Sequence, residues 1–287
     1  MMAGKKGTSS LARRGLRKLL KNSLSMVGTV VFTVMVFMSV FAPLFTKYEP
    51  GMMNMEESVL PPGPGHWFGT DRLGRDVYTQ ILYGGRVSLY VGLVGALLGA
   101  FLGMVFGILG GYLGGRLDTL LVKISEIFQT FPNMLLVLIL AGMMGQGVNN
   151  LVIIFSLTGW TTTFRMVRNQ ILVQKEELYV TACKGFGISD FSIMFRHILP
   201  NITSPIFVSI TINMAGYILQ EAGLSFLGLG VPVTTPTWGN IMNAAKSIQV
   251  IRDQWWLWLF PGLTISLFVL SVNFLGDGLR DVLDPRS

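Results

Sequence analysis

Residues 87–112, VSLYVGLVGALLGAFLGMVFGILGGY, form the stretch that decides the fold. The stretch contains no charged residue and exceeds the roughly 20 apolar residues that a helix needs to cross the hydrocarbon core of a membrane. Glycines recur at every fourth position from Gly95 to Gly111, which places them on one face of a helix. Because a glycine face lets a second helix approach closely, the spacing predicts tight helix packing, with a conducting role as the alternative.

Further uncharged runs follow along the chain. Hydrophobic residues make up 51% and charged residues 13% of the sequence, whereas soluble domains carry about 25% charged residues. A polar sequence at residues 145–150 divides the longest run and predicts a turn. We therefore expect an all-α integral membrane protein. Its six transmembrane helices are expected at residues 26–46, 87–112, 118–143, 149–166, 205–228 and 256–278.

The lysine and arginine residues predict how these helices are oriented. If the N-terminus is cytoplasmic, 16 of the 22 basic residues lie on the inner side of the membrane. Cytoplasmic loops carry the excess of basic residues in membrane proteins, so we expect both termini in the cytoplasm. The net charge of +7 then reflects membrane orientation and not nucleic-acid binding, since the basic residues are spread over separate loops.

The expected helices divide the chain into five segments. Residues 1–25 form a basic N-terminal tail, within which residues 9–21 fit either a helix on the inner membrane surface or a disordered tail. The other segments are the first transmembrane helix at 26–46, an extracytoplasmic segment at 47–86, a transmembrane core at 87–279 and a cytoplasmic tail at 280–287.

A proline marks the middle of the third expected span. Pro132 follows Phe131 and lacks a backbone donor, so it predicts a kink or break in the helix. Polar residues near such a kink can line a path through the membrane, although a purely structural kink fits equally well. The residues that we expect along a translocation path are Gln129, Asn133, Asn213, Gln220 and Glu221.

The loop between the fourth and fifth spans has internally consistent helix signals. Gly187 suits the left-handed position that ends one helix, and Ser189 suits the N-cap of the next. Leu178, Ala182 and Phe186 share a face of the first helix, while the second helix is expected to end at Pro200. The apolar faces fit either a foot against the membrane domain or a knob in the groove of a partner protein.

This loop resembles the EAA motif of ABC importer permeases, in which E-A-A is followed by three residues, G, nine residues and I-x-L-P. Ala182, Gly187, Leu199 and Pro200 match that pattern. Thr181, Cys183 and His197 stand where the pattern has Glu, Ala and Ile. The loop resembles the oligopeptide and dipeptide branch of this family more closely, through Glu177, Tyr179, Val180, His197, Pro200 and Asn201. The outer sequence FGTDRLGRDV at 68–77 is similar to the same branch.

The resemblance implies a type I importer permease fold and a coupling loop at residues 175–201. That loop would dock on a cytoplasmic ATPase through Glu177, Tyr179, Ala182, Cys183, Gly187, Asp190, His197 and Pro200. Implied partners are a sister permease in a heterodimer, two ATPase subunits and an extracytoplasmic binding protein, besides membrane lipid. The residues expected to contact the binding protein are Asp71, Arg72, Arg75, Asp76 and Trp238. The implied substrate is a peptide, with nickel or an oligosaccharide as alternatives.

Other features bear on catalysis and energy supply. The chain has no G-x-x-x-x-G-K-[ST] phosphate loop, so we expect no enzyme activity and no cofactor, with ATP bound by partner subunits. His66 and His197 fall on opposite sides of the membrane in this topology, so no histidine pair is expected to bind a metal. The resemblance implies a multi-pass protein of a prokaryotic cell membrane. The alternative from another class is an ion-coupled secondary transporter.

Overall fold

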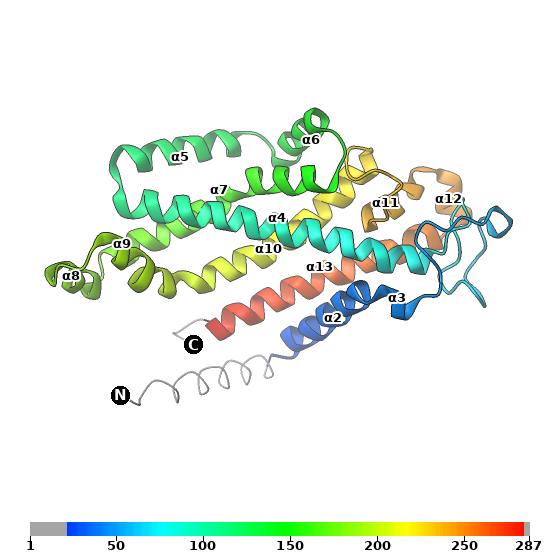
Figure 1. The fold of residues 1–287 in the computed structure, drawn as a ribbon, viewed down its shortest axis with the longest axis horizontal. Coiled ribbons are helices and arrows are strands. Elements are labelled where there is room, and N and C mark those ends of the chain that lie inside the picture. Colours follow the sequence, from blue (N-terminus) through cyan, green and yellow to red (C-terminus); the bar gives the residue numbers. More distant parts are fainter. Residues whose placement is uncertain (1–21, 284–287) are drawn as a thin grey trace.

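The computed structural model describes residues 22–283, and in this range the chain is helical without any β-strand. The tail segment 9–21 and residues 284–287 lie outside the described residues. Figure 1 shows five long helices side by side: α2 (Ser23–Val40), α4 (Val77–Leu113), α7 (Val148–Lys175), α10 (Thr203–Leu227) and α13 (Trp256–Leu283). Beside them lie α5 (Gly115–Thr130) and α6 (Asn133–Met144).

Short helices gather at the two ends of this bundle (Figure 1). One end carries α8 (Leu178–Gly185), α9 (Asp190–Ser192), the π-helical turn η2 (Ile193–Ile198) and the 3-10 turn η3 (Leu199–Ile202). The opposite end carries α3 (Ala42–Phe45), η1 (Met55–Glu57), α11 (Trp238–Met242), η4 (Asn243–Lys246) and α12 (Ile248–Asp253). We call these the α8 end and the α11 end.

The glycine face of α4 packs against α7, as the sequence predicted. A Cβ atom added at Gly103 would lie 2.5 Å from the carbonyl oxygen of Trp160, and one at Gly107 would lie 2.7 Å from Cβ of Val167. Real Cβ atoms do not approach other heavy atoms so closely, so the two backbones depend on glycine at these positions. Helix α4 also begins ten residues earlier than expected, because Asp76 caps it by accepting a hydrogen bond from the Thr79 N–H at 2.7 Å.

The third expected span, at 118–143, is not one helix. Helices α5 and α6 meet at an angle of 89° across Phe131 and Pro132. Phe131 adopts extended backbone angles (φ −89°, ψ 139°), as the residue before a proline favours, and Pro132 cannot donate the hydrogen bond that would continue the helix. The expected kink is therefore a full break.

Length and composition mark four helical stretches of the described chain as able to cross a membrane, or five if α5 and α6 count as one broken span. The four are α2, α4, the continuous stretch Asp190–Leu227 and α13. Helix α7 is 28 residues long but falls outside this set; it carries Arg165 and Arg168 in its second half.

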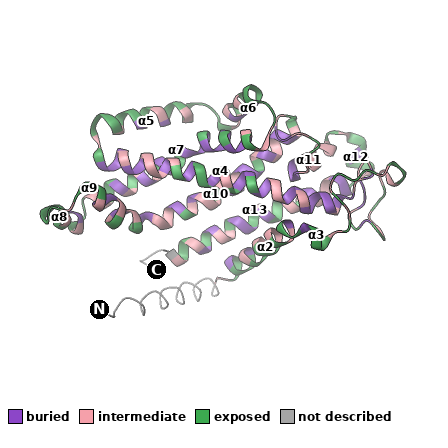
Figure 2. Ribbon diagram, in the orientation of Figure 1, coloured by how far each residue is buried: buried purple, intermediate pink, exposed green. Residues whose placement is uncertain are grey.

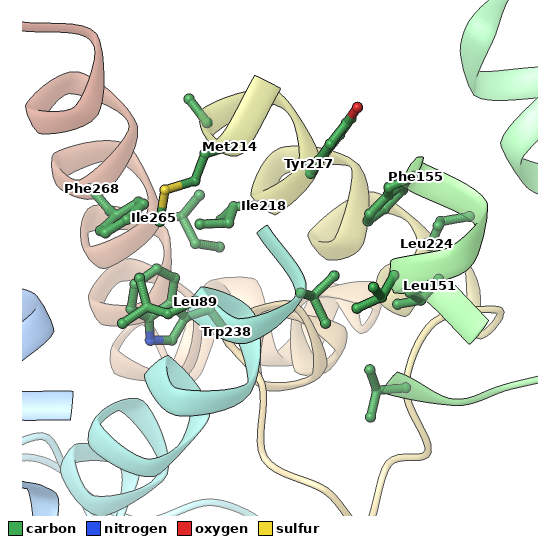
Figure 3. Close-up of a cluster of buried hydrophobic side chains, with 14 of the residues drawn as sticks. Leu89, Leu151, Phe155, Met214, Tyr217, Ile218, Leu224, Trp238, Ile265 and Phe268 are labelled. Carbon is green, nitrogen blue, oxygen red and sulfur yellow. The ribbon is translucent and has the colours of Figure 1, made fainter. Parts of the chain in front are cut away.

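The main hydrophobic core lies between α4, α7, α10, α11 and α13. In Figure 3, Phe155 of α7 stacks on Tyr217 of α10, with ring centroids 4.9 Å apart and planes 11° apart. Trp238 of α11 packs on Phe268 of α13 at 5.3 Å. Figure 2 shows that buried residues line the inner faces of the long helices, whereas α5 and α6 have only two buried residues each. Helices α5 and α6 therefore cover one side of the bundle with little burial of their own.

Candidate functional site

A cavity of about 530 Å³ opens beside the break between α5 and α6. Its other walls come from α7 and α10. Four of the five residues expected along a translocation path line this cavity: Gln129, Asn133, Asn213 and Gln220. They come from two segments that are about 80 residues apart in sequence, so the fold brings them together; their role in transport stays a prediction.

Further polar groups of the cavity were missed by the sequence analysis. Thr158, Thr161 and Thr162 of α7 contribute hydroxyl groups, and Tyr217 of α10 contributes a phenol. The threonines recur at spacings of three and four residues, which is a signal for one helix face that the sequence carries. None of the residues that line the cavity is charged. The cavity therefore offers hydrogen bonds without a fixed charge.

Two polar groups at this cavity have no partner within the described chain. The Tyr217 hydroxyl and Oε1 of Gln220 are both buried and form no hydrogen bond to another described residue. Tyr217 itself is only 3% exposed, and its hydroxyl points away from the core cluster in Figure 3. Gly159 makes room for this hydroxyl, because a Cβ atom there would overlap it. Buried polar groups normally find a partner, so these two oxygen atoms are exceptions among the described residues.

Glu221, the fifth residue expected on the path, does not line this cavity, and its role in transport stays a prediction. Its side chain is fully buried and accepts hydrogen bonds from the hydroxyls of Ser88 at 3.2 Å, Ser225 at 2.8 Å and Thr237 at 2.8 Å. Successive residues of a helix point about 100° apart around its axis, so Glu221 faces away from Gln220. The carboxyl group joins α4 and α10 to the segment before α11.

The residues expected to contact a binding protein divide into two groups. Asp76 is 7% exposed and caps α4, and Trp238 is 1% exposed with its indole N–H donating to the Ile81 carbonyl at 2.9 Å. Both side chains are thus engaged within the described chain, and their contact with a partner stays a prediction. Asp71, Arg72 and Arg75 line a surface pocket of about 290 Å³ that α11 also borders. Their role stays a prediction.

The α8 end carries the loop that was expected to couple to a partner. Its first turn signal is confirmed: Gly187 has φ +72°, its N–H donates to Lys184 O, and the N–H of Ile188 donates to Cys183 O. These two bonds form a Schellman motif that ends α8. The second signal is also confirmed, since the Ser189 hydroxyl accepts a hydrogen bond from Ser192 N–H at 3.4 Å and caps α9.

The two apolar faces of this loop differ in exposure. Leu178 at the start of α8 and Phe186 directly after it are 85% and 84% exposed, and Ala182 between them is exposed as well. Met194 and Ile198 after α9 are buried in a cluster with Val167 and Ile171 of α7. Phe191, on the same face as Met194 and Ile198, stays 69% exposed, so only the later part of the second face is a foot on the bundle. The first face has no counterpart in the described chain.

The other expected coupling residues lie in different surroundings. The Tyr112 hydroxyl of α4 donates to Asp190 at 2.6 Å, and Tyr179 donates to Gln174 at 2.7 Å. Cys183 packs against the buried cluster, Glu177 is exposed before α8, and the His197 carbonyl accepts from Asn201 at 2.9 Å. Tyr112 was not predicted, because only the fold brings it to the loop.

Pro200 does not end the second helix, contrary to expectation. The chain stays helical through η2 and η3 into α10. Proline removes one donor and crowds the turn before it, and a π-helical turn followed by a 3-10 turn accommodates both effects without a break. The loop is therefore continuous with α10, so α9 and α10 form one helical stretch of 38 residues.

Comparisons with known proteins agree with this architecture. Residues 103–287 match the family described as the binding-protein-dependent transport system inner membrane component. Residues 10–62 match the N-terminal transmembrane domain of oligopeptide transport permease C.

Individual relatives match along nearly the whole chain. A dipeptide transport system permease protein DppC of Bacillus subtilis is 38% identical, over 98% of this chain and 88% of its own length. A putative peptide permease protein of Brucella suis is also 38% identical, over 96% of this chain and 91% of its own. A putative peptide transport system permease protein of Brucella abortus is 40% identical, over 94% and 90%. The chain therefore belongs to the family of inner membrane permease components of binding-protein-dependent transport systems.

Proposed function

We propose that this chain is one permease subunit of an ATP-driven importer that takes up di- or oligopeptides. The observation that carries the proposal is the similarity to peptide permeases over at least 94% of the chain. The neutral cavity beside the α5–α6 break supports a path for a polar, uncharged backbone. We infer that the subunit forms half of that path and that a sister permease forms the other half.

The energy for transport enters through the α8 end in this proposal. The face of Leu178, Ala182 and Phe186 is an apolar surface on a rigid short helix, which suits the groove of an ATPase subunit. The foot formed by Met194 and Ile198 joins α8 to α7 and α10, so movement of the docked helix would shift both walls of the cavity. Two ATPase subunits, one for each permease, complete this scheme.

The proposed topology has six spans and both termini in the cytoplasm. Helix α7 is about 42 Å long at 1.5 Å per residue, which exceeds the membrane core of about 30 Å. Counting α7 and the broken α5–α6 pair with the four apolar stretches gives the six spans. The α11 end then faces outward, where Asp71, Arg72 and Arg75 offer a surface for the binding protein.

Purification of the tagged chain from native membranes tests this function. We expect an ATPase with a phosphate loop and a second permease to co-purify, as identified by mass spectrometry. Reconstituted into liposomes, the complex should hydrolyse ATP faster when peptide-loaded binding protein is added. Stimulation by a nickel- or oligosaccharide-loaded binding protein in place of the peptide-loaded one would contradict the peptide substrate. A homo-oligomer that imports peptide without ATP would contradict the ATP-driven mechanism.

A further inference from the structure

A second cavity, of about 350 Å³, lies at the α11 end, between α3, the start of α4 and the segment that joins them. It shares no lining residue with the cavity beside the α5–α6 break. Among the described residues that line it, Lys47 is the one basic residue and Asp76 the one acidic residue. Half of the lining residues are aromatic, and we call this cavity the aromatic pocket: Phe45, Tyr48, Trp67 and Tyr78.

Contacts within the chain hold the walls of the aromatic pocket in place. The Tyr48 hydroxyl donates a hydrogen bond to the Gly65 carbonyl at 3.1 Å, and the Tyr48 ring stacks on His66 with centroids 4.9 Å apart. Trp67 and Tyr78 pack on each other at 5.2 Å, although Trp67 remains 67% exposed. A ligand would therefore meet rings that are already ordered, which lowers the entropic cost of binding.

The charges and rings of the aromatic pocket suit a zwitterion. Lys47 is exposed and lies 5.0 Å from the centroid of the Tyr48 ring. It forms no ion pair with any carboxylate of the described residues, so its ammonium group is available to an anion. The faces of Trp67 and Tyr78 attract a cation, and Asp76 behind them adds negative charge to the same wall.

The aromatic pocket lies where the chain leaves the membrane. Helices α2 and α3 together occupy residues 23–45, or about 34 Å at 1.5 Å per residue, against a membrane core of about 30 Å. Helix α2 is apolar enough to cross a membrane, and Phe45 at the end of α3 lines the pocket (Figure 1). Tryptophan and tyrosine are enriched at the level of the lipid head groups. The pocket is therefore at the depth of those head groups.

A track of exposed phenylalanines leads from α2 to the aromatic pocket. Phe37, Phe41 and Phe45 are 48%, 44% and 36% exposed. The Phe37 ring lies 4.7 Å from that of Phe41 and 6.0 Å from that of Phe45, between centroids. Leu44 beside them is 76% exposed. An apolar track that ends in a pocket with one residue of each charge matches the two parts of a phospholipid, its acyl chain and its head group.

We propose that the aromatic pocket binds one zwitterionic phospholipid from the leaflet at the α11 end. The lipid phosphate pairs with Lys47, its ammonium group lies on the faces of Trp67 and Tyr78, and an acyl chain lies along the phenylalanine track. The bound lipid would brace α3 against the start of α4, where the hydroxyls of Thr46 and Thr79 already share a hydrogen bond. This site is separate from the proposed transport path and does not depend on the peptide substrate.

Photocrosslinking tests the site. The complex is purified through a tag on the full chain and incubated with phosphatidylethanolamine that carries a diazirine in its acyl chain, and mass spectrometry locates the crosslinks. We expect labelling of residues 37–45, reduced at least about threefold in Lys47→Gln and in Trp67→Leu. The matched controls at the same end are Lys246→Gln, which removes a lysine that also lies over a ring, and Trp255→Leu, at 43% exposure. Both controls should label as the wild type does.

Competition on the wild-type complex needs no variant and identifies the ligand. Unlabelled phosphatidylethanolamine should suppress the crosslink, whereas phosphatidylglycerol, which lacks the ammonium group, should need at least about a threefold higher concentration. Free phosphoethanolamine at the same concentration should not compete, because it lacks the acyl chain.

Equal labelling of the wild type and both pocket variants would overturn the inference, as would equal competition by phosphatidylglycerol. Competition by free phosphoethanolamine would show a site for a soluble phosphate compound in place of a lipid. A complex that labels as expected but imports no peptide would refute the proposed function alone, so the two failures are distinguishable.

Discussion

Glu221 is a residue whose type suggests a transport site but whose position in the fold indicates a structural role. A carboxyl group within a transmembrane helix is costly and usually marks a transport site. Here three hydroxyl donors surround it, from α4, from α10 and from the segment before α11. The Ser88 hydroxyl also accepts a hydrogen bond from the Trp238 N–H at 3.2 Å, so the carboxyl group belongs to a network that holds α11 in the bundle.

Removing this carboxyl group should destabilise the protein more than it affects transport. Glu221→Ala leaves buried hydroxyls without an acceptor and should cost about 2 kcal/mol or more in the free energy of unfolding. Glu221→Gln keeps an acceptor oxygen and should retain uptake close to the wild-type rate. Thermal unfolding of the purified complex measures the first effect and liposome uptake the second. The control is Glu56→Ala at an exposed position, and a large loss of uptake in a stable Glu221→Gln would instead place the residue on the path.

At the scale of helices, the contact between α4 and α7 is made by glycines. Gly107 lies against Val167 and Gly111 against Ile171, each closer than a Cβ atom would permit. Without a strong hydrophobic drive between helices in lipid, this close packing supplies much of their association. The two helices also frame the α8 end, since α7 leads directly into α8.

Gly107→Leu should therefore separate α4 from α7. The added side chain meets Val167 side-chain atoms and the Phe164 carbonyl, and helix backbones yield less readily than side chains. We expect a lower midpoint of thermal unfolding and a lower yield of assembled complex. Gly142→Leu on α6 is the matched control, because a side chain there meets nothing within 4 Å in the chain. Equal yields and midpoints for the two variants would refute the packing role.

Gly187 lies between α8 and α9, in the loop that we propose couples to an ATPase subunit. Its left-handed backbone should cost about 1 kcal/mol when a tryptophan replaces glycine, but the surrounding space is open. Gly187→Trp should therefore insert and assemble, while the bulky side chain beside α8 blocks the ATPase groove and uncouples ATP hydrolysis from uptake. Gly228→Trp, at a position of similar φ (+84°) and equal openness after α10, controls for backbone strain. Undiminished peptide uptake per ATP in Gly187→Trp would count against the coupling role.

The contrast between these elements shows what sequence patterns can predict. Gly187 and Ser189 were predicted correctly because their signals are local: a backbone that favours glycine and a side chain that caps the next helix. Pro132 predicted a disruption but not its 89° size, which depends on how α6 packs. Ser88 lies 133 residues from Glu221 and Asp190 lies 78 residues from Tyr112, so no local pattern indicates these two contacts.

At the scale of the whole molecule, one side of the described chain leaves large apolar side chains uncovered. Large apolar side chains of α5 and α6 face outward, including Ile127, Ile139 and Met143 at 61%, 59% and 79% exposure. Exposed apolar surface of this kind is covered by lipid or by another subunit in a membrane protein. The cavity opens between these same two helices and the bundle, so it lies beside this uncovered apolar surface.

The proposed topology predicts which of three positions, at the two ends of the bundle, can be reached from outside the membrane. In a Cys183→Ser background the chain has no native thiol, so Glu176→Cys, Gln146→Cys and Gln249→Cys can be introduced singly at exposed positions. A membrane-impermeant maleimide applied to spheroplasts should label Cys at 146 and 249 but reach 176 only after the membrane is opened. That pattern requires α7 to cross despite its two arginines, of which Arg168 is paired with Asp118 at 2.5 and 2.6 Å. Protection of position 146 together with 176 would mean that α7 does not cross, and labelling of 176 alone would invert the orientation.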